Sequence, residues 1–257
     1  MKRYRILSWN VNGLRAALKK NFLSWFLKES PDILCLQEIK ALVSQLPPEI
    51  LYPPGYYAEW NSAERLGYSG VATFSKAKPL SVKKGFGIKK FDTEGRVLES
   101  EYPEFTLLNI YFPNGKMSQE RLDFKMDFYE EALKYFQRLR KKGKKLVVCG
   151  DVNTAHEPID LARPKENEKI SGFLPIERAW MDELVGRGFI DTFRVFNSDP
   201  GQYTWWDQLS RARDRNVGWR IDYHFISDDL RPNLEEALIR PEVMGSDHCP
   251  VEVVLKF

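Results

Sequence analysis

The chain has 257 residues, of which 43% are hydrophobic and 29% charged, with a formal net charge of +3. This composition is typical of a globular protein and excludes a disordered or fibrous chain. The longest apolar runs fall far short of the ~20 residues that a membrane-spanning helix requires. Because no secretory h-region follows Met1, we expect an intracellular protein, cytoplasmic and nucleoid-associated, with no membrane partner.

In the first part of the chain, short apolar runs predict strands, and a stripe of apolar residues at helical spacing predicts one helix over Leu14–Lys28. The predicted strands are Arg5–Trp9, Ile33–Gln37, Tyr56–Asn61, Val71–Ser75 and Arg96–Ser100.

The second part continues with strands at Phe105–Tyr111, Lys145–Cys149, Ile221–Ile226 and Val251–Phe257. A long helix is predicted over Ser118–Lys142, with Ser118 as a candidate N-cap, and another over Pro175–Arg187, with proline in its first turn. Strands that alternate with helices and hairpins favour an α/β fold of two packed sheets covered by helices. With no linker or low-complexity tract, we expect one domain over residues 1–257.

The three cysteines, Cys35, Cys149 and Cys249, cannot all pair, and each lies within or beside an apolar run. Reduced cysteine in such a place behaves as a small hydrophobic residue. Cys249 follows His248, but neighbouring residues on a strand point to opposite faces, which favours packing over a thiol nucleophile.

Polar side chains follow several of the predicted strands, where an α/β scaffold can bring distant residues to one pocket. The full set is Asn10, Asn12, Glu38, Asp151, Asn153, Asp222, Asp247 and His248, most of which lie just past a predicted strand. Carboxylates, amides and one imidazole can together hold a hard divalent cation and activate water, which indicates metal-assisted phosphoester hydrolysis. Each motif alone has a simpler explanation: Gly150–Asn153 is also common turn chemistry, and His248 could be a structural surface residue.

Two further segments carry groups suited to nucleic acid. Tyr111–Lys116 offers a phenol, an amide and an ammonium for phosphate contacts, although its Pro-Asn-Gly sequence is also that of a turn. Tryptophans at 205, 206 and 219 lie among arginines at 211, 213, 215 and 220, a pattern that suits stacking on a nucleotide and gripping its backbone. A buried aromatic cluster with a solvated rim is the competing interpretation.

Taken together, the motifs are specific, and the sequence resembles the exonuclease III family of abasic-site endonucleases, within the larger fold of deoxyribonuclease I and inositol polyphosphate phosphatases. The matching motifs are Trp9–Ala16, Leu36–Lys40, Gly67–Ala72, Tyr111–Gly115, Gly150–Asn153, Asn216–Tyr223 and Gly245–Pro250. They span nearly the whole chain.

The resemblance implies a deoxyribonuclease I-like, four-layered α/β sandwich with two mixed β-sheets flanked by helices. It implies Mg²⁺-dependent cleavage of duplex DNA 5′ to an abasic site, leaving a 3′-hydroxyl, with Mn²⁺ as a plausible substitute. Additional 3′→5′ exonuclease or 3′-end-cleaning activity and incision at damaged bases are compatible with it. We expect a monomer.

The same resemblance implies roles for individual residues. The metal ligands are expected to be Glu38, Asn12, Asp247 and Asn10, although some relatives carry aspartate where this chain has Asn12. The catalytic residues are expected to be Asp151, which activates or positions water, with Asn153, the Asp222–His248 pair, Tyr111 and Asn114. The DNA-contact residues are expected to be Lys116, Arg15, Trp205, Trp206, Leu209, Arg211, Trp219 and Ile221.

Two other functions share these features. A phosphatase or phosphodiesterase acting on inositol phosphates or small esters would use the same metal and base residues, and only the basic aromatic segment argues against it. A catalytically silent DNA-binding or scaffold module would have lost at least one of Glu38, Asp151, Asp222 or His248, and none is lost.

Overall fold

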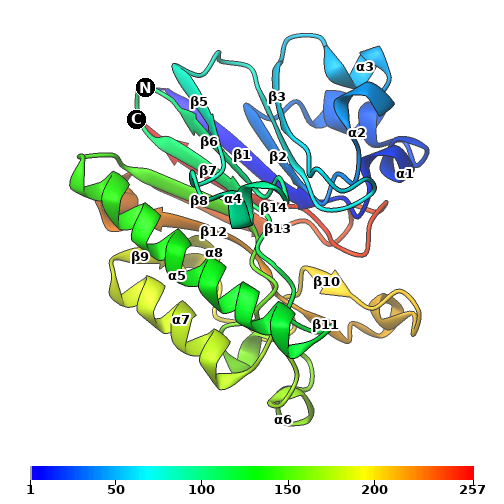
Figure 1. The fold of residues 1–257 in the computed structure, drawn as a ribbon, viewed down its shortest axis with the longest axis vertical. Helices are drawn as coiled ribbons and strands as arrows, with labels where there is room; N and C mark the ends of the chain where they lie inside the picture. The colour runs from blue at the N-terminus through cyan, green and yellow to red at the C-terminus, as the bar shows by residue number, and fades with distance from the viewer. Residues whose placement is uncertain (1) are drawn as a thin grey trace.

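The computed structural model describes residues 2–257 and contains two six-stranded sheets packed face to face, with helices on both outer faces (Figure 1). Each sheet mixes parallel and antiparallel pairs. This arrangement is the predicted four-layered α/β sandwich. Within the described residues, no helix is both long and apolar enough to cross a membrane.

The first sheet has the strand order β13-β14-β1-β2-β4-β3, and the second has the order β5-β6-β7-β8-β12-β9. The first contains β1 (Arg3–Asn10), β2 (Ile33–Gln37), β3 (Tyr57–Asn61), β4 (Val71–Ser75), β13 (Leu234–Ile239) and β14 (Val251–Lys256). The second contains β5 (Ser81–Lys84), β6 (Val97–Glu101), β7 (Thr106–Ile110), β8 (Leu146–Asp151), β9 (Phe189–Asp191) and β12 (Asp222–Ser227). A separate hairpin joins β10 (Trp205–Trp206) to β11 (Gly218–Trp219).

The helices are α1 (Leu14–Leu18), α2 (Phe22–Glu29), α3 (Pro48–Leu51), α4 (Lys89–Asp92), α5 (Gln119–Lys141), α6 (Pro164–Asn167), α7 (Pro175–Gly186) and α8 (Thr192–Phe196). The longer ones lie on the two outer faces (Figure 1), whereas α8 contacts β12 and β13, one strand from each sheet. α1 and α2 lie beside the first sheet, and α5 and α7 beside the second. The long helix α5 starts as predicted, because the Ser118 side chain accepts a hydrogen bond from the backbone N–H of Arg121 at 3.2 Å.

Three apolar cores correspond to the three interfaces between the four layers. One joins the second sheet to α5 and α7 and contains Phe128 and Trp180, and another joins the first sheet to α1 and α2 through Trp9 and Phe26. The third lies between the sheets and includes Ile6 from β1 and Val147 from β8. Both sheets therefore share one continuous interior.

The predicted helix over Leu14–Lys28 is wrong as a single element, because the structure breaks it into α1 and α2. Asn21, at the start of α2, has a left-handed backbone with φ of 64°. Asparagine tolerates this conformation better than most residues, and it turns the chain between the two helices.

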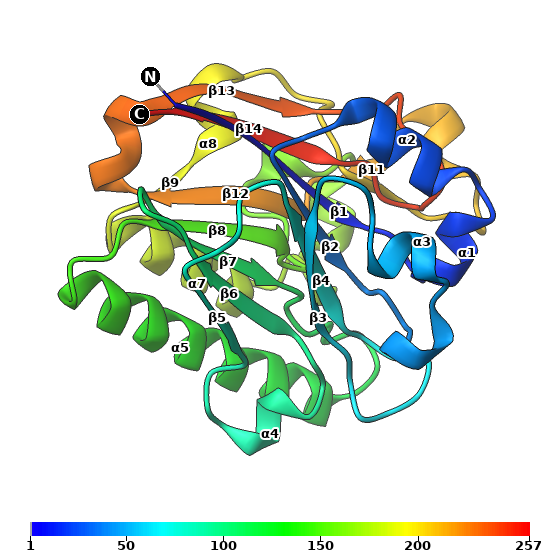
Figure 2. The ribbon, with the colours of Figure 1, turned by 90° about the horizontal axis from the view of Figure 1, so that it is seen from above.

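The ends of the strands place the polar motifs at one edge of the sandwich. β1 and β2 run parallel and Asn10 pairs with Gln37, so the two strands end on the same side of the sheet. β8 and β12 run antiparallel with Asp151 directly opposite Asp222. The chain termini lie together at the other end of β1 and β14 (Figure 2), since Arg3 pairs with Lys256.

Candidate active site

A pocket of about 200 Å³ opens where these strand ends meet. Its lining consists of Asn12, Glu38, Tyr111, Asn114, Lys116, Asp151, Asn153, Gly172, Trp205, Trp219, Ile221, Asp247 and His248. Residues from eight separate stretches of the chain therefore share one cavity. One wall is polar and acidic, and the other is formed by two indoles and an isoleucine.

The backbone at this pocket adopts an uncommon conformation. Asn12, Glu38 and Asn153 have positive φ angles of 45°, 55° and 56°. The left-handed region is unfavourable for a glutamate, and such residues concentrate at functional sites, where surrounding contacts hold them. At Glu38, the backbone carbonyl accepts a hydrogen bond from Gly13 N–H at 2.8 Å. The chain therefore holds Glu38 in a fixed position at the pocket wall.

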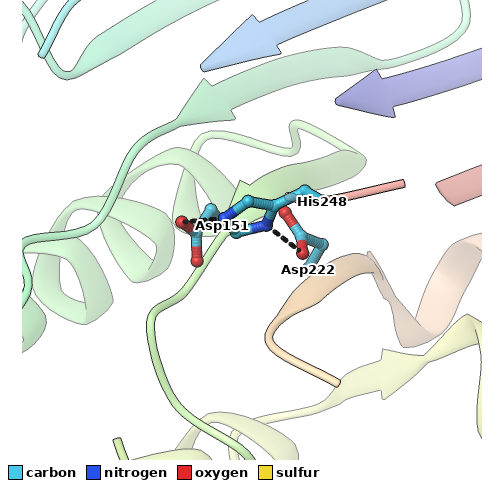
Figure 3. A group of neighbouring side chains, drawn as sticks. All are labelled: Asp151, Asp222 and His248. Atoms are coloured by element: carbon cyan, nitrogen blue, oxygen red, sulfur yellow. Dashed lines mark hydrogen bonds and ion pairs between the residues drawn. The ribbon is translucent and has the colours of Figure 1, made fainter. Parts of the chain in front are cut away.

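His248 is the central group of a buried, charged cluster (Figure 3). Its Nδ1 lies 2.8 Å from Asp222 Oδ2, and its Nε2 lies 3.9 Å from Asp151 Oδ2. Burial opposes protonation of the imidazole, but the negative charges of Asp222, Asp151 and Asp247 prevail and raise the pKa of His248 to about 10. At neutral pH the ring is therefore a cation that can donate to a phosphate oxygen and cannot act as a base.

Asp151 is buried and has contacts of its own. Its Oδ2 accepts a hydrogen bond from Asn10 Nδ2, and its Oδ1 accepts one from the backbone N–H of Asn153, both at 2.8 Å. Burial, and then repulsion from the Asp222 carboxylate, raise the pKa of Asp151 to about 7. A carboxylate with a pKa near the working pH is well suited to general-base catalysis.

Replacing Asp222 with asparagine should lower the pKa of His248 from about 10 toward the ordinary histidine range. The reason is that the Asp222 carboxylate makes the largest contribution to stabilising the protonated ring. Titration of the histidine ring protons by NMR measures this shift, and the chain has only three histidines to assign. The control is Asp182→Asn on α7, which contacts His156 and leaves the buried cluster unchanged. An unchanged His248 titration in Asp222→Asn would show that the pair does not control the charge of the ring.

The oxygen-rich wall fits a hard divalent cation. Glu38 and Asn12 already surround one positive charge, since Lys40 Nζ lies 2.9 Å from Glu38 Oε1 and 2.6 Å from Asn12 Oδ1. Asp247 lies beside them, with its Oδ1 accepting a hydrogen bond from Asn12 Nδ2 at 2.9 Å. Carboxylate and amide oxygens are the donors that Mg²⁺ prefers. The Lys40 ammonium shows that this place accepts a cation.

Asp151, Asp222 and His248 also lie close enough together to suggest a metal site. The raised pKa of His248 argues against it, because a protonated ring has no free lone pair, and its Nδ1 is already bonded to Asp222. A metal ligand must offer a free lone pair. The cluster is therefore better suited to proton transfer and phosphate binding. A divalent cation fits better beside Glu38.

Tyr111, Asn114 and Asn153 provide neutral donors on the polar wall. Asn114 Nδ2 donates to Asn153 Oδ1 at 2.8 Å, and Asn153 Nδ2 donates to the Phe112 carbonyl at 3.0 Å. Burial, and then the charge of Glu38, raise the pKa of Tyr111 well above the usual range for a phenol. Its hydroxyl therefore stays protonated and can donate to an anionic oxygen.

Two expected site residues have other places in the structure. Asn10 is buried, its Nδ2 donating to Asp151 and its Oδ1 accepting from the Asn12 backbone N–H, so both polar ends of its side chain already have partners in the protein. Trp206 is buried away from the pocket, with its Nε1 donating to Asn216 Oδ1 at 3.0 Å. Adjacent residues of β10 point to opposite sides, so only Trp205 of this pair reaches the pocket.

The remaining expected DNA-contact residues fall into two groups. Trp205, Trp219 and Ile221 form the aromatic wall, and Trp205 Nε1 donates to Asp247 Oδ2 at 3.1 Å. Arg15, Leu209 and Arg211 lie outside the pocket on the exposed surface, and Leu209 is 97% exposed. These three could reach only a ligand that extends well beyond the cavity.

The residues that support the turn over Gly150–Asn153 from the interior side were not predicted from the sequence. Lys125 of α5 is fully buried and donates to the Asn153 carbonyl at 2.7 Å, to Thr154 Oγ1 at 2.8 Å and to Glu177 Oε1 at 2.6 Å. Glu177 in turn accepts a hydrogen bond from the backbone N–H of Gly172, which lines the pocket. The available signal was a lysine on the face of an amphipathic helix that packs inward.

Lys125→Met should destabilise the fold by about 3–5 kcal/mol, because it leaves the Glu177 carboxylate buried without its cation. The double variant Lys125→Met/Glu177→Met should recover much of this loss. Urea unfolding gives the free energy for each variant. Equal destabilisation in the single and the double variants would show that the charge on Glu177 is not the cause.

The model of the Endonuclease/Exonuclease/phosphatase family matches residues 7–248. An exodeoxyribonuclease of Bacillus subtilis is 44% identical over 253 residues, covering 98% of this chain and 99% of that protein. The DNA repair nuclease APEX1 of Danio rerio is 45% identical over 256 residues, covering 98% of this chain and 82% of that protein.

Among solved structures, an AP endonuclease from Archaeoglobus fulgidus superimposes with a TM-score of 0.90 at 27% identity, covering 99% of this chain and all of that one. Family model, relatives and fold thus agree along nearly the full length of the chain. The chain belongs to the endonuclease/exonuclease/phosphatase family.

Proposed function

We propose that the protein is a Mg²⁺-dependent DNA repair endonuclease that hydrolyses the phosphodiester bond 5′ to abasic sites in duplex DNA and leaves a 3′-hydroxyl. The observation that carries the proposal is the buried Asp151–His248–Asp222 cluster facing the indoles of Trp205 and Trp219 across one pocket. The names of the relatives, a DNA repair nuclease and an AP endonuclease, support the same substrate.

In this proposal Asp151 takes a proton from the attacking water, because it is the pocket carboxylate whose pKa lies near neutrality. General-base help contributes about 10²–10⁴-fold, or roughly 3–5 kcal/mol. Since enzymes lower such barriers by ~8–23 kcal/mol, most of the effect must come from stabilising negative charge on the phosphate. His248, Asn153, Asn114 and Tyr111 supply the donors for it.

Glu38 would hold the metal, with Asn12 and Asp247 beside it. When bound, Mg²⁺ supplies positive charge next to the scissile phosphate. Lys40 would have to leave the oxygens of Glu38 and Asn12 for a metal to be held there, since its ammonium lies within hydrogen-bonding distance of both. Lys40 thereby neutralises this part of the wall before the metal binds.

Selectivity for abasic sites would come from the shape of the pocket. A cavity of about 200 Å³ walled by Trp205, Trp219 and Ile221 suits a compact sugar more than a complete nucleotide. A nucleotide without a base also leaves the helix at a lower unstacking cost than an intact one. Exposed Arg15 and Arg211 would contact the flanking phosphates, so that binding weakens steeply with salt.

A substrate comparison tests the proposal. Duplexes with one abasic site, undamaged duplexes and soluble phosphomonoesters are incubated with Mg²⁺ or with chelator. We expect Mg²⁺-dependent nicking of the abasic duplex alone at low enzyme concentration. Faster release of inorganic phosphate from the small esters would favour a phosphatase instead. We also propose that the protein is monomeric and cytoplasmic. Light scattering in solution, which gives the molar mass, tests whether it is a monomer.

A further inference from the structure

Lys116 differs from the other lysines near the active site because its amine has no polar partner. Lys40 Nζ is bound to Glu38 and Asn12, and Lys125 Nζ is bound to three oxygens in the interior. For Lys116, no acceptor within residues 2–257 lies at hydrogen-bonding or ion-pair distance of Nζ, although its backbone N–H donates to Asn114 Oδ1. The amine is therefore free for a ligand.

The position of this amine is defined by the aromatic wall. Lys116 Nζ lies 5.0 Å from the ring centroid of Trp205 and 5.1 Å from that of Trp219. Its side chain is exposed at the rim, and it lines the same pocket as Asp151 and His248. A sugar seated against the two indoles would meet this nitrogen directly.

The surroundings also favour reactivity. Desolvation lowers the pKa of Lys116, which increases the fraction of neutral amine, and the negative charges of Glu177, Asp151 and Asp207 offset only part of this effect. A neutral lysine amine next to a carbonyl is the usual starting point for a Schiff base.

We propose that Lys116 forms an imine with the ring-opened aldehyde of an abasic sugar, which gives the protein a second, metal-independent mode of covalent capture. The neutral Nζ attacks C1′ as one nitrogen proton passes to the aldehyde oxygen, which gives a carbinolamine. Its hydroxyl then leaves with the second nitrogen proton as water, and the C=N bond forms. No oxidant or reductant is required, and hydrolysis reverses the step. The proposal rests on the abasic-site function above, because only that substrate carries the aldehyde.

Reductive trapping tests it. The full chain is mixed in chelator with a duplex that contains either a natural abasic site or its tetrahydrofuran analogue, which has no aldehyde, and sodium cyanoborohydride is added. We expect a covalent protein–DNA band only with the natural site, and a tryptic digest should place the adduct on Lys116. Absence of a band, or an adduct on another lysine, would overturn the proposal.

Three variants separate the amine from its charge. Lys116→Arg keeps the positive charge for phosphate contacts but should lose trapping, as should Lys116→Met, whereas Lys84→Arg on the distant strand β5 should trap like the wild type. Persistent trapping in Lys116→Arg would contradict the assignment. Incision of the tetrahydrofuran duplex with Mg²⁺ is measured in parallel. If that incision occurs without trapping, the imine is wrong and the proposed function stands; if neither occurs, the proposed function fails.

Discussion

Asp151→Asn is expected to lower the rate of incision by about 10²–10⁴-fold, the contribution of a general base. The amide keeps the size of the side chain but cannot take a proton from water. Single-turnover rates on an abasic duplex at saturating Mg²⁺ measure the effect. The matched control is Asp127→Asn, an exposed aspartate of α5 that is ion-paired with Lys90 and should leave the rate unchanged.

The pH dependence of the wild type follows from the same cluster. Because the pKa of Asp151 is about 7, the rate should rise with pH until that carboxyl has lost its proton. It should fall again near pH 10, where His248 loses its proton. The three groups titrate as a coupled cluster, so these limits belong to the cluster as a whole. In Asp151→Asn the acidic limb should disappear; an unchanged limb would assign the base elsewhere.

Glu38→Ala is expected to lose most activity at low Mg²⁺ and to recover part of it as Mg²⁺ is raised, because the variant weakens metal binding without removing the base. A Mg²⁺ titration of incision rates for Glu38→Ala and Asp151→Asn measures this difference. Asp151→Asn should show no such recovery. Glu49→Ala, an exposed glutamate of α3, serves as the control. An identical Mg²⁺ response in Glu38→Ala and Asp151→Asn would show that the two roles are assigned wrongly.

The Glu38→Ala change should also remove one of the two contacts of the Lys40 ammonium in the pocket. Without the Glu38 carboxylate, Lys40 keeps only the Asn12 amide oxygen as a partner in the pocket. Circular dichroism of Glu38→Ala should show an unchanged fold, since Glu38 is half-buried at the edge of the sandwich rather than in its core.

The sequence predicted the central strands well because buried strands are continuous apolar runs. Ile33–Gln37 and Val71–Ser75 match the observed β2 and β4 at both ends. β13 was missed because its sequence, Leu-Glu-Glu-Ala-Leu-Ile, has no strand alternation, and it pairs with β14 at the edge of the sheet through an irregular register. β5 is also an edge strand, short and rich in lysine, and tertiary pairing decides its conformation.

The sequence predicted which residues form the site better than it predicted which residues contact each other there. The motifs at the strand ends named Glu38, Asp151 and His248, and the structure brings all three to one pocket. The sequence could not show that Asn10 faces Asp151 while Asn12 faces Asp247, because that difference depends on how the two sheets pack. The sequence indicated that Lys116 was available for phosphate contacts, but not that its amine would lie against the rings of Trp205 and Trp219.

We expect this pocket to direct water to the phosphorus atom 5′ to an abasic sugar. The most direct measurement is incision of an abasic duplex in ¹⁸O-labelled water with Mg²⁺, followed by mass spectrometry of both fragments. We predict one ¹⁸O atom in the 5′-phosphate of the fragment that carries the abasic sugar, and an unlabelled 3′-hydroxyl on the other. Cleavage on the 3′ side of the lesion, or a phosphate without label, would contradict hydrolysis by Asp151 and His248.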